Sequence, residues 1–245
     1  MTLPLPFNIK FLSEVDSTNL YAIRNLSNLS DKEVICAEIQ TGGIGRHSRK
    51  WISDKKDNIY LSIILKPFGA PSELPLSALP QYMSVVLCRL LESFSIKAEI
   101  KWPNDTLVDG KKLAGILCQS AFSGTNLDGF VLGLGVNLNL TQNDIKQISQ
   151  PATSLNLLTG SAINRDKFRD NLLKNFFAQY DTFLSEGFQF IHNEYVNRCT
   201  SLGKSITIRT NSREITGFAE SISPDGTMTM ISGGIRQSVS TGEII

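Results

Sequence analysis

A tight turn in the middle of the chain constrains the fold more than any other local feature. Asp109-Gly110 separates two β-prone runs at residues 106–108 and 113–121, and this dipeptide is a strong signal for a short hairpin. Strands joined by so short a turn pair antiparallel, because parallel strands need a crossover of about a dozen residues or more. The sequence therefore disfavours an all-parallel, doubly wound sheet.

The residues around this hairpin alternate between expected strands and expected helices. Apolar, β-prone runs predict strands at 7–15, 34–39, 59–66, 96–102 and 129–140. Capping residues and helical spacing predict helices from 16–19 through about 29, and at 74–94, 165–187 and 188–200. This part of the chain, residues 1–200, is expected to form one mixed α and β domain.

The sequence pattern changes at Gly203. Short β-prone runs follow at 205–210, 215–222 and 227–232, and turn residues such as Pro224-Asp225-Gly226 divide them. Short strands with this punctuation indicate a small β-barrel. We therefore expect a second domain over residues 201–245.

The composition excludes several classes of protein. The 245 residues are 41% hydrophobic and 19% charged, as in ordinary globular proteins, and a net charge of +1 gives no field that would attract nucleic acid or membrane. No signal peptide or stretch of membrane-spanning length is present. Cys36, Cys88, Cys118 and Cys199 are far apart, which predicts buried, reduced thiols in a cytosolic protein rather than a zinc site or disulfides.

Residues 41–51 (TGGIGRHSRKW) combine glycines, positive charge and an aromatic side chain. A phosphate-binding P-loop is excluded, because no G-x-x-x-x-G-K-[ST] pattern occurs. Two alternatives remain open for this loop alone: a solvated basic surface loop, or a loop that closes over an anionic ligand. In the second case the glycines allow close backbone approach, Arg46 and Arg49 clamp carboxylate or phosphate, and Trp51 stacks on a planar base.

A second cluster lies at residues 101–117 (KWPNDTLVDGKKLAGIL). Asn104 and Asp105 follow a strand that ends at Trp-Pro, and the hairpin returns through Lys111 and Lys112. A lysine that opens an apolar strand is usually an exposed edge charge. Because this hairpin brings a lysine back across from Asn104 and Asp105, that lysine can serve as a fixed cation at a reaction centre.

The order and spacing of these motifs resemble the biotin protein ligase family. That family carries an early S-T-N, a signature close to G-R-G-R-x-G-R-x-W, then K-W-P-N-D, K-L-x-G-I-L and G-x-G-x-N. The matching residues here are Ser17-Thr18-Asn19, Gln40, Gly43-Ile44-Gly45-Arg46, Arg49, Trp51, 101–105, 112–117 and 133–137. The terminal Thr241-Gly242-Glu243 also looks like the end of the family's small C-terminal barrel.

The resemblance implies an α+β fold. Its catalytic domain would have a mixed, largely antiparallel sheet with helices, like class II aminoacyl-tRNA synthetases and other biotin and lipoate ligases. A small C-terminal barrel like a Src-homology-3 domain would follow. The chain begins at the expected catalytic domain, so we expect no DNA-binding domain and no DNA partner.

Two positions depart from the family signature. Ile44 replaces an arginine, and Ser48 replaces a glycine. If the family uses the backbone N–H at position 44, the change is tolerable. If it needs both arginine side chains, phosphate binding here is weaker.

The resemblance also implies the reaction. The biotin carboxylate attacks the α-phosphate of ATP to give biotinyl-5′-AMP, and a lysine of the biotin carboxyl carrier protein of acetyl-CoA carboxylase then attacks this anhydride. Mg²⁺ accompanies ATP, and the enzyme is expected in the cytoplasm, with a homodimer allowed.

Each site residue receives an expected role from this reaction. Lys112, Arg46 and Asp105 are the expected catalytic residues, with Asp105 either placing Mg²⁺ or accepting a proton. The expected biotin-binding residues are Ser17, Thr18, Asn19, Gln40, Gly43, Ile44, Gly45, Arg46, Lys112 and Gly115. The expected nucleotide-binding residues are Arg46, Arg49, Trp51, Asn104, Lys112 and Asn137. Ser17 and Thr18 also suit helix capping, and Trp51 also suits a core position.

Two other functions compete with this interpretation. A lipoate or octanoate ligase of the same fold would need a long acyl tunnel, and the R-R-x-S-G-G-G stretch typical of those enzymes does not occur. A non-catalytic biotin-binding protein would have no need to keep Lys112, Arg46 and Asp105 together.

Overall fold

The computed structural model describes residues 7–66, 78–123, 126–210 and 212–245, and its main feature is a seven-stranded sheet. The strands are β1 (Ile9–Val15), β2 (Val34–Gln40), β3 (Ile59–Leu65), β4 (Glu99–Lys101), β5 (Asp105–Val108), β6 (Lys111–Ser123) and β7 (Asn126–Val136). They lie in the order β1-β2-β3-β7-β6-β5-β4. Only β1 and β2 pair in parallel within this sheet. The predicted mixed, largely antiparallel sheet is confirmed.

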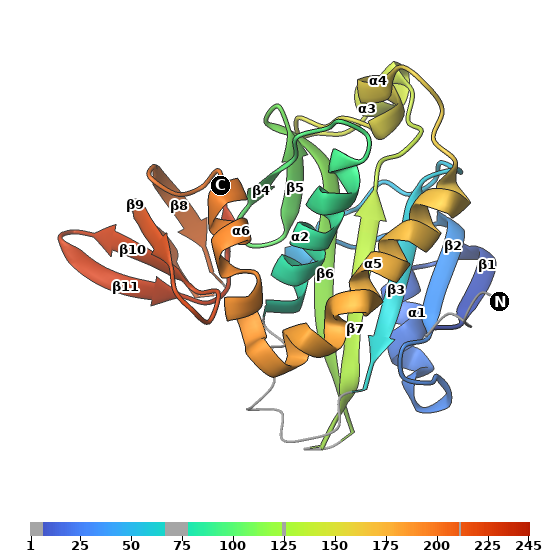
Figure 1. Cartoon of the computed structure of the whole chain (residues 1–245), viewed down its shortest axis with the longest axis horizontal. Coiled ribbons are helices and arrows are strands. Elements are labelled where there is room, and N and C mark those ends of the chain that lie inside the picture. Colours follow the sequence, from blue (N-terminus) through green and yellow to red (C-terminus); the bar gives the residue numbers. More distant parts are fainter. Residues whose placement is uncertain (1–6, 67–77, 124–125, 211) are drawn as a thin grey trace.

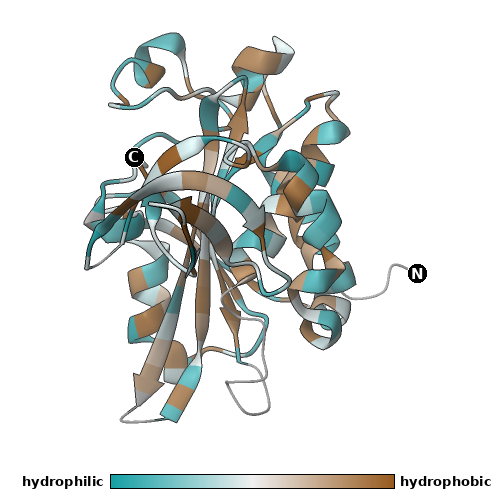
Figure 2. Cartoon of the chain, turned by 90° about the vertical axis from the view of Figure 1, so that its left-hand side faces the viewer, coloured by the Kyte–Doolittle hydropathy of each residue, from teal (hydrophilic) through white to brown (hydrophobic). Residues whose placement is uncertain are grey.

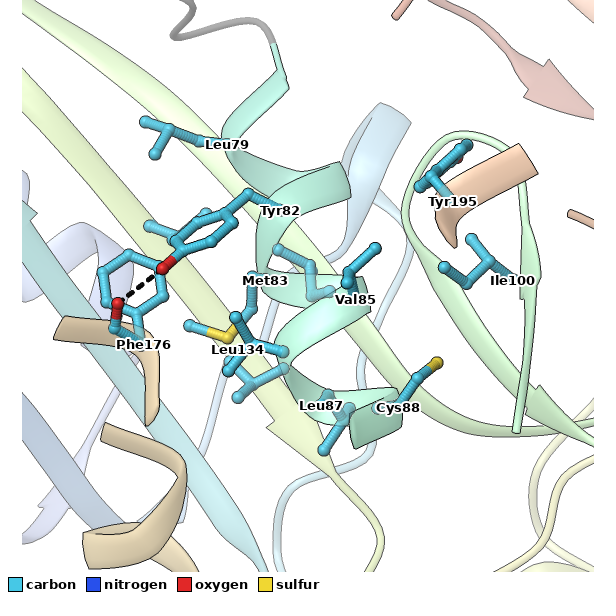
Figure 3. Packing of buried hydrophobic residues seen from close by; sticks show 14 of the residues in the cluster. Leu79, Tyr82, Met83, Val85, Leu87, Cys88, Ile100, Leu134, Phe176 and Tyr195 are labelled. Atoms are coloured by element: carbon cyan, nitrogen blue, oxygen red, sulfur yellow. Dashed lines mark hydrogen bonds between the residues drawn. The ribbon is translucent and has the colours of Figure 1, made fainter. Parts of the chain in front are cut away.

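Helices cover both faces of this sheet. The helices α2 (Leu79–Glu92) and α5 (Arg165–Glu186) cross one face, as Figure 1 shows. Tyr82 of α2 stacks on Phe183 of α5 with ring centroids 4.4 Å apart, and its hydroxyl donates to the Phe176 carbonyl (Figure 3). The short helix α1 (Thr18–Arg24) packs on the other face through Ala22, with Ile64 of β3 in the same cluster.

Burial on both faces explains the composition of the central strands. Every residue of β3 is buried, and Figure 2 shows apolar residues running along the strands while the helices alternate between apolar and polar bands. Successive side chains of a strand point to opposite faces. Leu61 and Ile63 of β3 therefore join the α2 side of the core, while Ser62 points toward α1.

The C-terminal residues form a second, five-stranded antiparallel sheet. Its strands are β8 (Ser205–Arg209), β9 (Glu214–Ile222), β10 (Met228–Ser232), β11 (Ile235–Val239) and β12 (Glu243–Ile244), in the order β11-β10-β9-β8-β12. The helix α6 (His192–Arg198) lies beside it in Figure 1. The Gly226 carbonyl of this sheet accepts hydrogen bonds from Gln81 and from the Trp102 indole. The predicted fold class is confirmed, and the division at residue 200 stays a prediction.

Several element boundaries differ from those expected. The first helix ends at Arg24 and continues only as a 3-10 turn, and the helix expected at 188–200 is a 3-10 turn followed by α6. The helix expected at 74–94 begins at Leu79, while residues 74–77 lie outside the described ranges. Four elements were not predicted from the sequence, because they are too short or too polar to show periodicity: α3 (Gln142–Ile145), α4 (Leu155–Thr159), β11 and β12.

The four cysteines are unpaired, as expected. Cys36, Cys88 and Cys199 are buried and Cys118 is half-buried. Burial raises the pKa of the Cys36 and Cys88 thiols to about 12, which keeps both protonated and unreactive at neutral pH. No helix in the described ranges has the length and apolar character needed to cross a membrane.

Candidate active site

A cavity of about 530 Å³ opens where the start of α1, the end of β2 and the start of β5 come together. Ser17 and Gln40 line this cavity near the start of α1, and Lys112, Arg46 and Glu243 also line the cavity. The elements that supply these residues are far apart in the sequence. The fold therefore brings the early S-T-N, the glycine-rich loop and the central hairpin to one place.

Glycines on neighbouring strands form the floor of this cavity. A Cβ atom on Gly133 would lie 2.1 Å from Asn19 Oδ1, and one on Gly135 would lie 2.5 Å from the Trp51 indole. Gly115 pairs with Gly135 across the sheet, and its Cβ would also meet Trp51, at 3.0 Å. The glycines thus leave the space in which Asn19 and Trp51 lie on the sheet.

A buried polar network lines the end of the cavity near α1. Gln40 Oε1 accepts hydrogen bonds from the backbone N–H of Thr18 at 2.8 Å and from its hydroxyl at 3.1 Å. Ser62 Oγ lies 2.8 Å from Thr18 Oγ1 and 2.6 Å from Asn19 Oδ1. Asn19 Nδ2 donates to the Leu117 carbonyl and to Gln119 Oε1. Ser17 caps no N–H of α1 with its side chain, so its hydroxyl is available to a ligand.

The glycine-rich loop has a hairpin backbone, which its sequence did not predict. Ile44 bridges Lys50, the N–H of Gly45 donates to the Arg49 carbonyl at 2.7 Å, and the N–H of Trp51 donates to the Gly43 carbonyl. His47 occupies the turn with a φ of 51°. The loop is therefore a short two-stranded finger that presents Arg46 and Arg49 from its tip.

Both arginines of this loop contact the C-terminal segment. Arg46 donates to Asn104 Oδ1 at 3.2 Å, to the Gly242 carbonyl at 2.8 Å and to Thr241 Oγ1 at 2.8 Å. Burial lowers the pKa of Arg46, while nearby Asp105 and Glu243 oppose this shift. The three hydrogen-bond acceptors of Arg46 are uncharged, so they hold the guanidinium in place without neutralising its charge.

Arg49 of the same loop forms an ion pair with Glu243. The arginine side chain is 53% exposed and the glutamate side chain 22%. A pair this open to solvent contributes little to stability, so an anionic ligand can compete with Glu243 for Arg49.

Lys112 and Asp105 form an ion pair across the central hairpin. Their charged atoms lie 2.8 Å apart, and their side chains are 16% and 21% exposed. The Lys112 ammonium also lies 5.5 Å from the centroid of the Trp51 ring. Lys111 is exposed and does not line the cavity. The alternation of a strand thus directs only one of the two lysines into the site.

Most of the predicted site residues meet at this cavity. Its lining contains Ser17, Thr18, Asn19, Gln40, Ile44, Gly45, Arg46, Arg49, Trp51, Asn104, Asp105, Lys112 and Gly115. Gly43 lies behind the lining, where its Cβ would be 2.7 Å from the Trp51 carbonyl oxygen. Asn137 instead lines an adjoining cavity of about 190 Å³ that shares Trp51 and Lys112 with the first.

Other residues of the cavity and its network received no site role from the sequence. These are Glu243 and Ile244, Gly133, Ser149, Gln150, and the network residues Ser62 and Gln119. Ser62 carried a signal, because it is the polar residue in the otherwise apolar centre of IYLSIIL. Glu243 also carried a signal, because it lies in the terminal segment that looks like the end of the family's C-terminal barrel.

The described residues contain no cluster of three or more His, Cys, Asp or Glu side chains that would hold a metal ion. Asp105 and Glu243 are the carboxylates that line the cavity, and each is paired with a cation. A Mg²⁺ ion at this site would therefore take most of its ligands from phosphate oxygens and water.

Comparisons with known proteins agree with this geometry. Residues 11–137 match the biotin/lipoate A/B protein ligase family. A biotin--[acetyl-CoA-carboxylase] ligase of Paracoccus denitrificans is 31% identical over 95% of this chain and 98% of its own length. The bifunctional ligase/repressor BirA of Bacillus subtilis is 29% identical over 83% of this chain, which spans only 63% of that protein's length. A structure of a biotin protein ligase from Aquifex aeolicus in complex with biotin and ATP superposes with a TM-score of 0.80 at 28% identity, covering 97% of both chains.

Proposed function

The chain belongs to the biotin/lipoate A/B protein ligase family, and we propose from this premise that it is a biotin protein ligase. It activates biotin with ATP to form biotinyl-5′-AMP, and then transfers the biotinyl group to a lysine of a biotin carboxyl carrier protein. The relative from Paracoccus denitrificans, which has nearly the same length, carries the name of this activity.

The observation that carries the proposal is the pairing of two chemically different ends in one cavity. The polar end, with Ser17, Thr18 and Gln40, offers hydroxyl and amide groups suited to a ureido ring. The cationic end, with Lys112 and Arg46, suits a carboxylate and phosphates. An acyl chain without a polar ring would bury the Ser17 hydroxyl, which caps no N–H of α1, without a partner, and an unpaired buried group costs about 1–3 kcal/mol. This argues for biotin over lipoate or octanoate.

In the first step a carboxylate oxygen of biotin attacks the α-phosphorus, and the bond from phosphorus to pyrophosphate breaks. Both reactants are anions, so fixed cations must offset their repulsion before they align. Asp105 holds the Lys112 ammonium in place at 2.8 Å. Arg46 has five N–H donors, and its three hydrogen bonds to protein acceptors leave the others for phosphate oxygens.

In the second step the neutral amine of the acceptor lysine attacks the carbonyl carbon of the mixed anhydride. The bond from that carbon to AMP breaks, and the amine loses a proton. Asp105 is a carboxylate at this end of the cavity and is the proposed acceptor for that proton. Its ion pair with Lys112 supports an additional role in orienting the cation.

We assign adenine to the adjoining cavity of about 190 Å³, which Trp51 and Asn137 line. The Trp51 indole N–H is buried over Gly135 without a hydrogen-bond partner, so we assign the contact with adenine to the Trp51 ring and not to this N–H. Asn137 Nδ2 donates to the Thr153 carbonyl. Asn137 Oδ1 therefore points away from that carbonyl, and we propose that it accepts from the adenine amino group. Asn104 bonds to Arg46 and to the Ile116 carbonyl, and this supports a holding role rather than direct contact with nucleotide.

The remaining partners follow from the reaction. Mg²⁺ accompanies ATP and supplies positive charge to the phosphates, and the acceptor is proposed to be the carrier subunit of acetyl-CoA carboxylase. The four unpaired thiols fit a reducing compartment, which supports the cytoplasm as the place of action. A homodimer stays a prediction that sedimentation with and without biotinyl-5′-AMP would test.

Incubation with ATP and labelled biotin, with and without a biotin acceptor domain, tests the function. Label on the acceptor and release of pyrophosphate are expected. Transfer of lipoate or octanoate instead would assign the chain to the other branch of the family. Biotin binding without pyrophosphate release would make it a binding protein.

The loop of residues 41–50 is predicted to be more mobile without ligand than with biotinyl-5′-AMP, chiefly at its tip, because hydrogen bonds hold the base of the hairpin in the free protein. Its tip has few partners besides the C-terminal segment, and ligand phosphate would add charge-assisted hydrogen bonds to both arginines. Hydrogen exchange at the amides of residues 45–50 measures this. Equal protection in the two states would contradict the prediction.

Replacing Thr241 with valine is expected to raise KM for ATP about fivefold, equivalent to roughly 1 kcal/mol. The substitution removes an oxygen that accepts from Arg46, at 2.8 Å, while it keeps the shape of the side chain. Steady-state kinetics measures the effect, and Thr241→Ser should restore KM because it keeps the hydroxyl. If the serine and valine variants behave alike, the contact with Arg46 does not matter.

A further inference from the structure

The polar end of the cavity depends on two residues that no motif identifies, Ser62 of β3 and Gln119 of β6. Ser62 is fully buried, at 0% exposure, and it sits in a strand whose other residues are apolar or aromatic. A buried hydroxyl in such a strand is costly unless its hydrogen bonds are met. Its partners are Thr18 and Asn19, both in the first turn of α1.

The hydrogen-bond directions in this network follow from its fixed donors and acceptors. The Leu117 carbonyl can only accept, so the Asn19 amide must point its Nδ2 toward that carbonyl and toward Gln119 Oε1. Asn19 Oδ1 therefore faces Ser62, where it can only accept. Ser62 is the donor to both of its partners, with its single hydroxyl proton shared between Asn19 Oδ1, 2.6 Å away, and Thr18 Oγ1, 2.8 Å away.

The direction of the Ser62 proton decides what Thr18 presents to the cavity. The backbone N–H of Thr18 donates to Gln40 Oε1, so this oxygen is an acceptor. The Thr18 hydroxyl donates to Gln40 Oε1 at 3.1 Å, and its oxygen accepts from Ser62 Oγ at 2.8 Å. The Thr18 proton therefore stays within the network, on the Gln40 side, and Thr18 offers its remaining lone pair to a ligand.

We propose that Ser62 and Gln119 are positioning residues that make Thr18 an obligate hydrogen-bond acceptor for an N–H of a cyclic urea. The inference rests on the proposed function, since it concerns how the ureido ring of biotin is selected. Gln119 holds the Asn19 amide in the required orientation at 2.9 Å, and Gly133 leaves the space that Asn19 Oδ1 occupies. The network thereby determines, before any ligand binds, that Thr18 accepts and does not donate a hydrogen bond in the cavity.

Ser62→Ala is the direct test. The variant leaves Asn19 Oδ1 buried without its donor and removes the donor that keeps the Thr18 oxygen in its acceptor role. We expect Kd and KM for biotin to rise between five- and tenfold, with kcat and KM for ATP changed by less than twofold. Isothermal titration with biotin and steady-state kinetics measure these values. A tenfold change corresponds to about 1.4 kcal/mol.

Ser84→Ala is the matched control. Ser84 is also fully buried, at 0% exposure, and donates to the Pro80 carbonyl within α2, on the other face of the sheet. It should lower the melting temperature without changing Kd for biotin. At position 119, Gln119→Glu keeps an oxygen that accepts from Asn19 and should bind biotin more tightly than Gln119→Leu.

A second measurement separates this inference from the proposed function. Exchange of the Asn19 side-chain amide protons, measured by NMR in the unliganded protein, should accelerate in Ser62→Ala and not in Ser84→Ala. If the native protein binds no biotin but this acceleration occurs, the proposed function fails and the network stands. Unchanged exchange together with a Kd for biotin within twofold of the native value would overturn the inference and leave the function intact.

Discussion

Lys112→Ala is expected to reduce the rate of adenylate formation by about 10²–10³. The ammonium is the cation that Asp105 fixes at the end of the cavity, with its side chain only 16% exposed. Its attraction for negative charge is greatest when the biotin carboxylate and the α-phosphate approach each other, so the loss falls on the chemical step. The removal also leaves the Asp105 carboxylate without its partner in a site that must accept anions, which adds to the repulsion.

Pyrophosphate release measures this prediction, and Lys111→Ala is its matched control. Lys111 is the preceding residue of the same strand, is exposed and lies outside the cavity lining. Biotin binding to Lys112→Ala should fall much less than the rate does, because the ureido contacts lie at the other end of the cavity. Nearly normal rates in both variants, or a larger loss in Lys111→Ala, would show that the catalytic cation is another residue.

The pairing of Lys112 with Asp105 was accessible from the sequence because it is local. Seven positions separate the two residues, and the Asp109-Gly110 turn forces the strands between them to pair antiparallel. A bulge at Thr106 and Leu107 adjusts the register, so that Leu107 lies across from Lys112. Turn chemistry and strand alternation together therefore limit where Lys112 can point, and no long-range information is needed.

The contacts of the C-terminal segment could not be predicted in this way. Arg46 and Gly242 are separated by most of the chain, and nothing in either local sequence specifies that they meet. Their contact requires the second sheet to dock beside α6 and β4, through contacts such as that between Trp102 and Gly226. The sequence indicated charge in the loop, but the acceptors that fix this charge come from tertiary packing.

The glycine-rich loop shows the same limit for the backbone. Its glycines suggested a chain that folds only around a ligand, whereas the structure has a hairpin whose base is hydrogen-bonded. A glycine in the sequence shows only that a side chain is absent. It does not show whether the backbone must move at that position or whether other atoms pack where the side chain would be. At Gly43 the surrounding atoms favour the second explanation, because backbone and side-chain atoms lie where a Cβ would be.

Gly43→Ala is therefore expected to weaken biotin binding between about tenfold and a hundredfold. The added methyl would lie 2.3 Å from Ser53 Oγ and 2.7 Å from the Trp51 carbonyl oxygen. The carbonyl belongs to the other strand of the finger and cannot move without breaking its base, and overpacking of this kind typically costs about 1–3 kcal/mol. The methyl would also approach Gln40 Nε2 to 3.1 Å, which displaces an amide of the polar end.

Gly42→Ala separates this steric effect from a general need for glycine in the loop. A Cβ on Gly42 would meet only the Asp16 carbonyl, at 3.4 Å, which is ordinary contact, and its backbone needs no left-handed conformation. Titration with biotin should therefore give a nearly native Kd for Gly42→Ala and a much higher one for Gly43→Ala. If both variants lose affinity equally, the loop requires freedom of its backbone at each glycine, and close packing at Gly43 is not the reason for that residue.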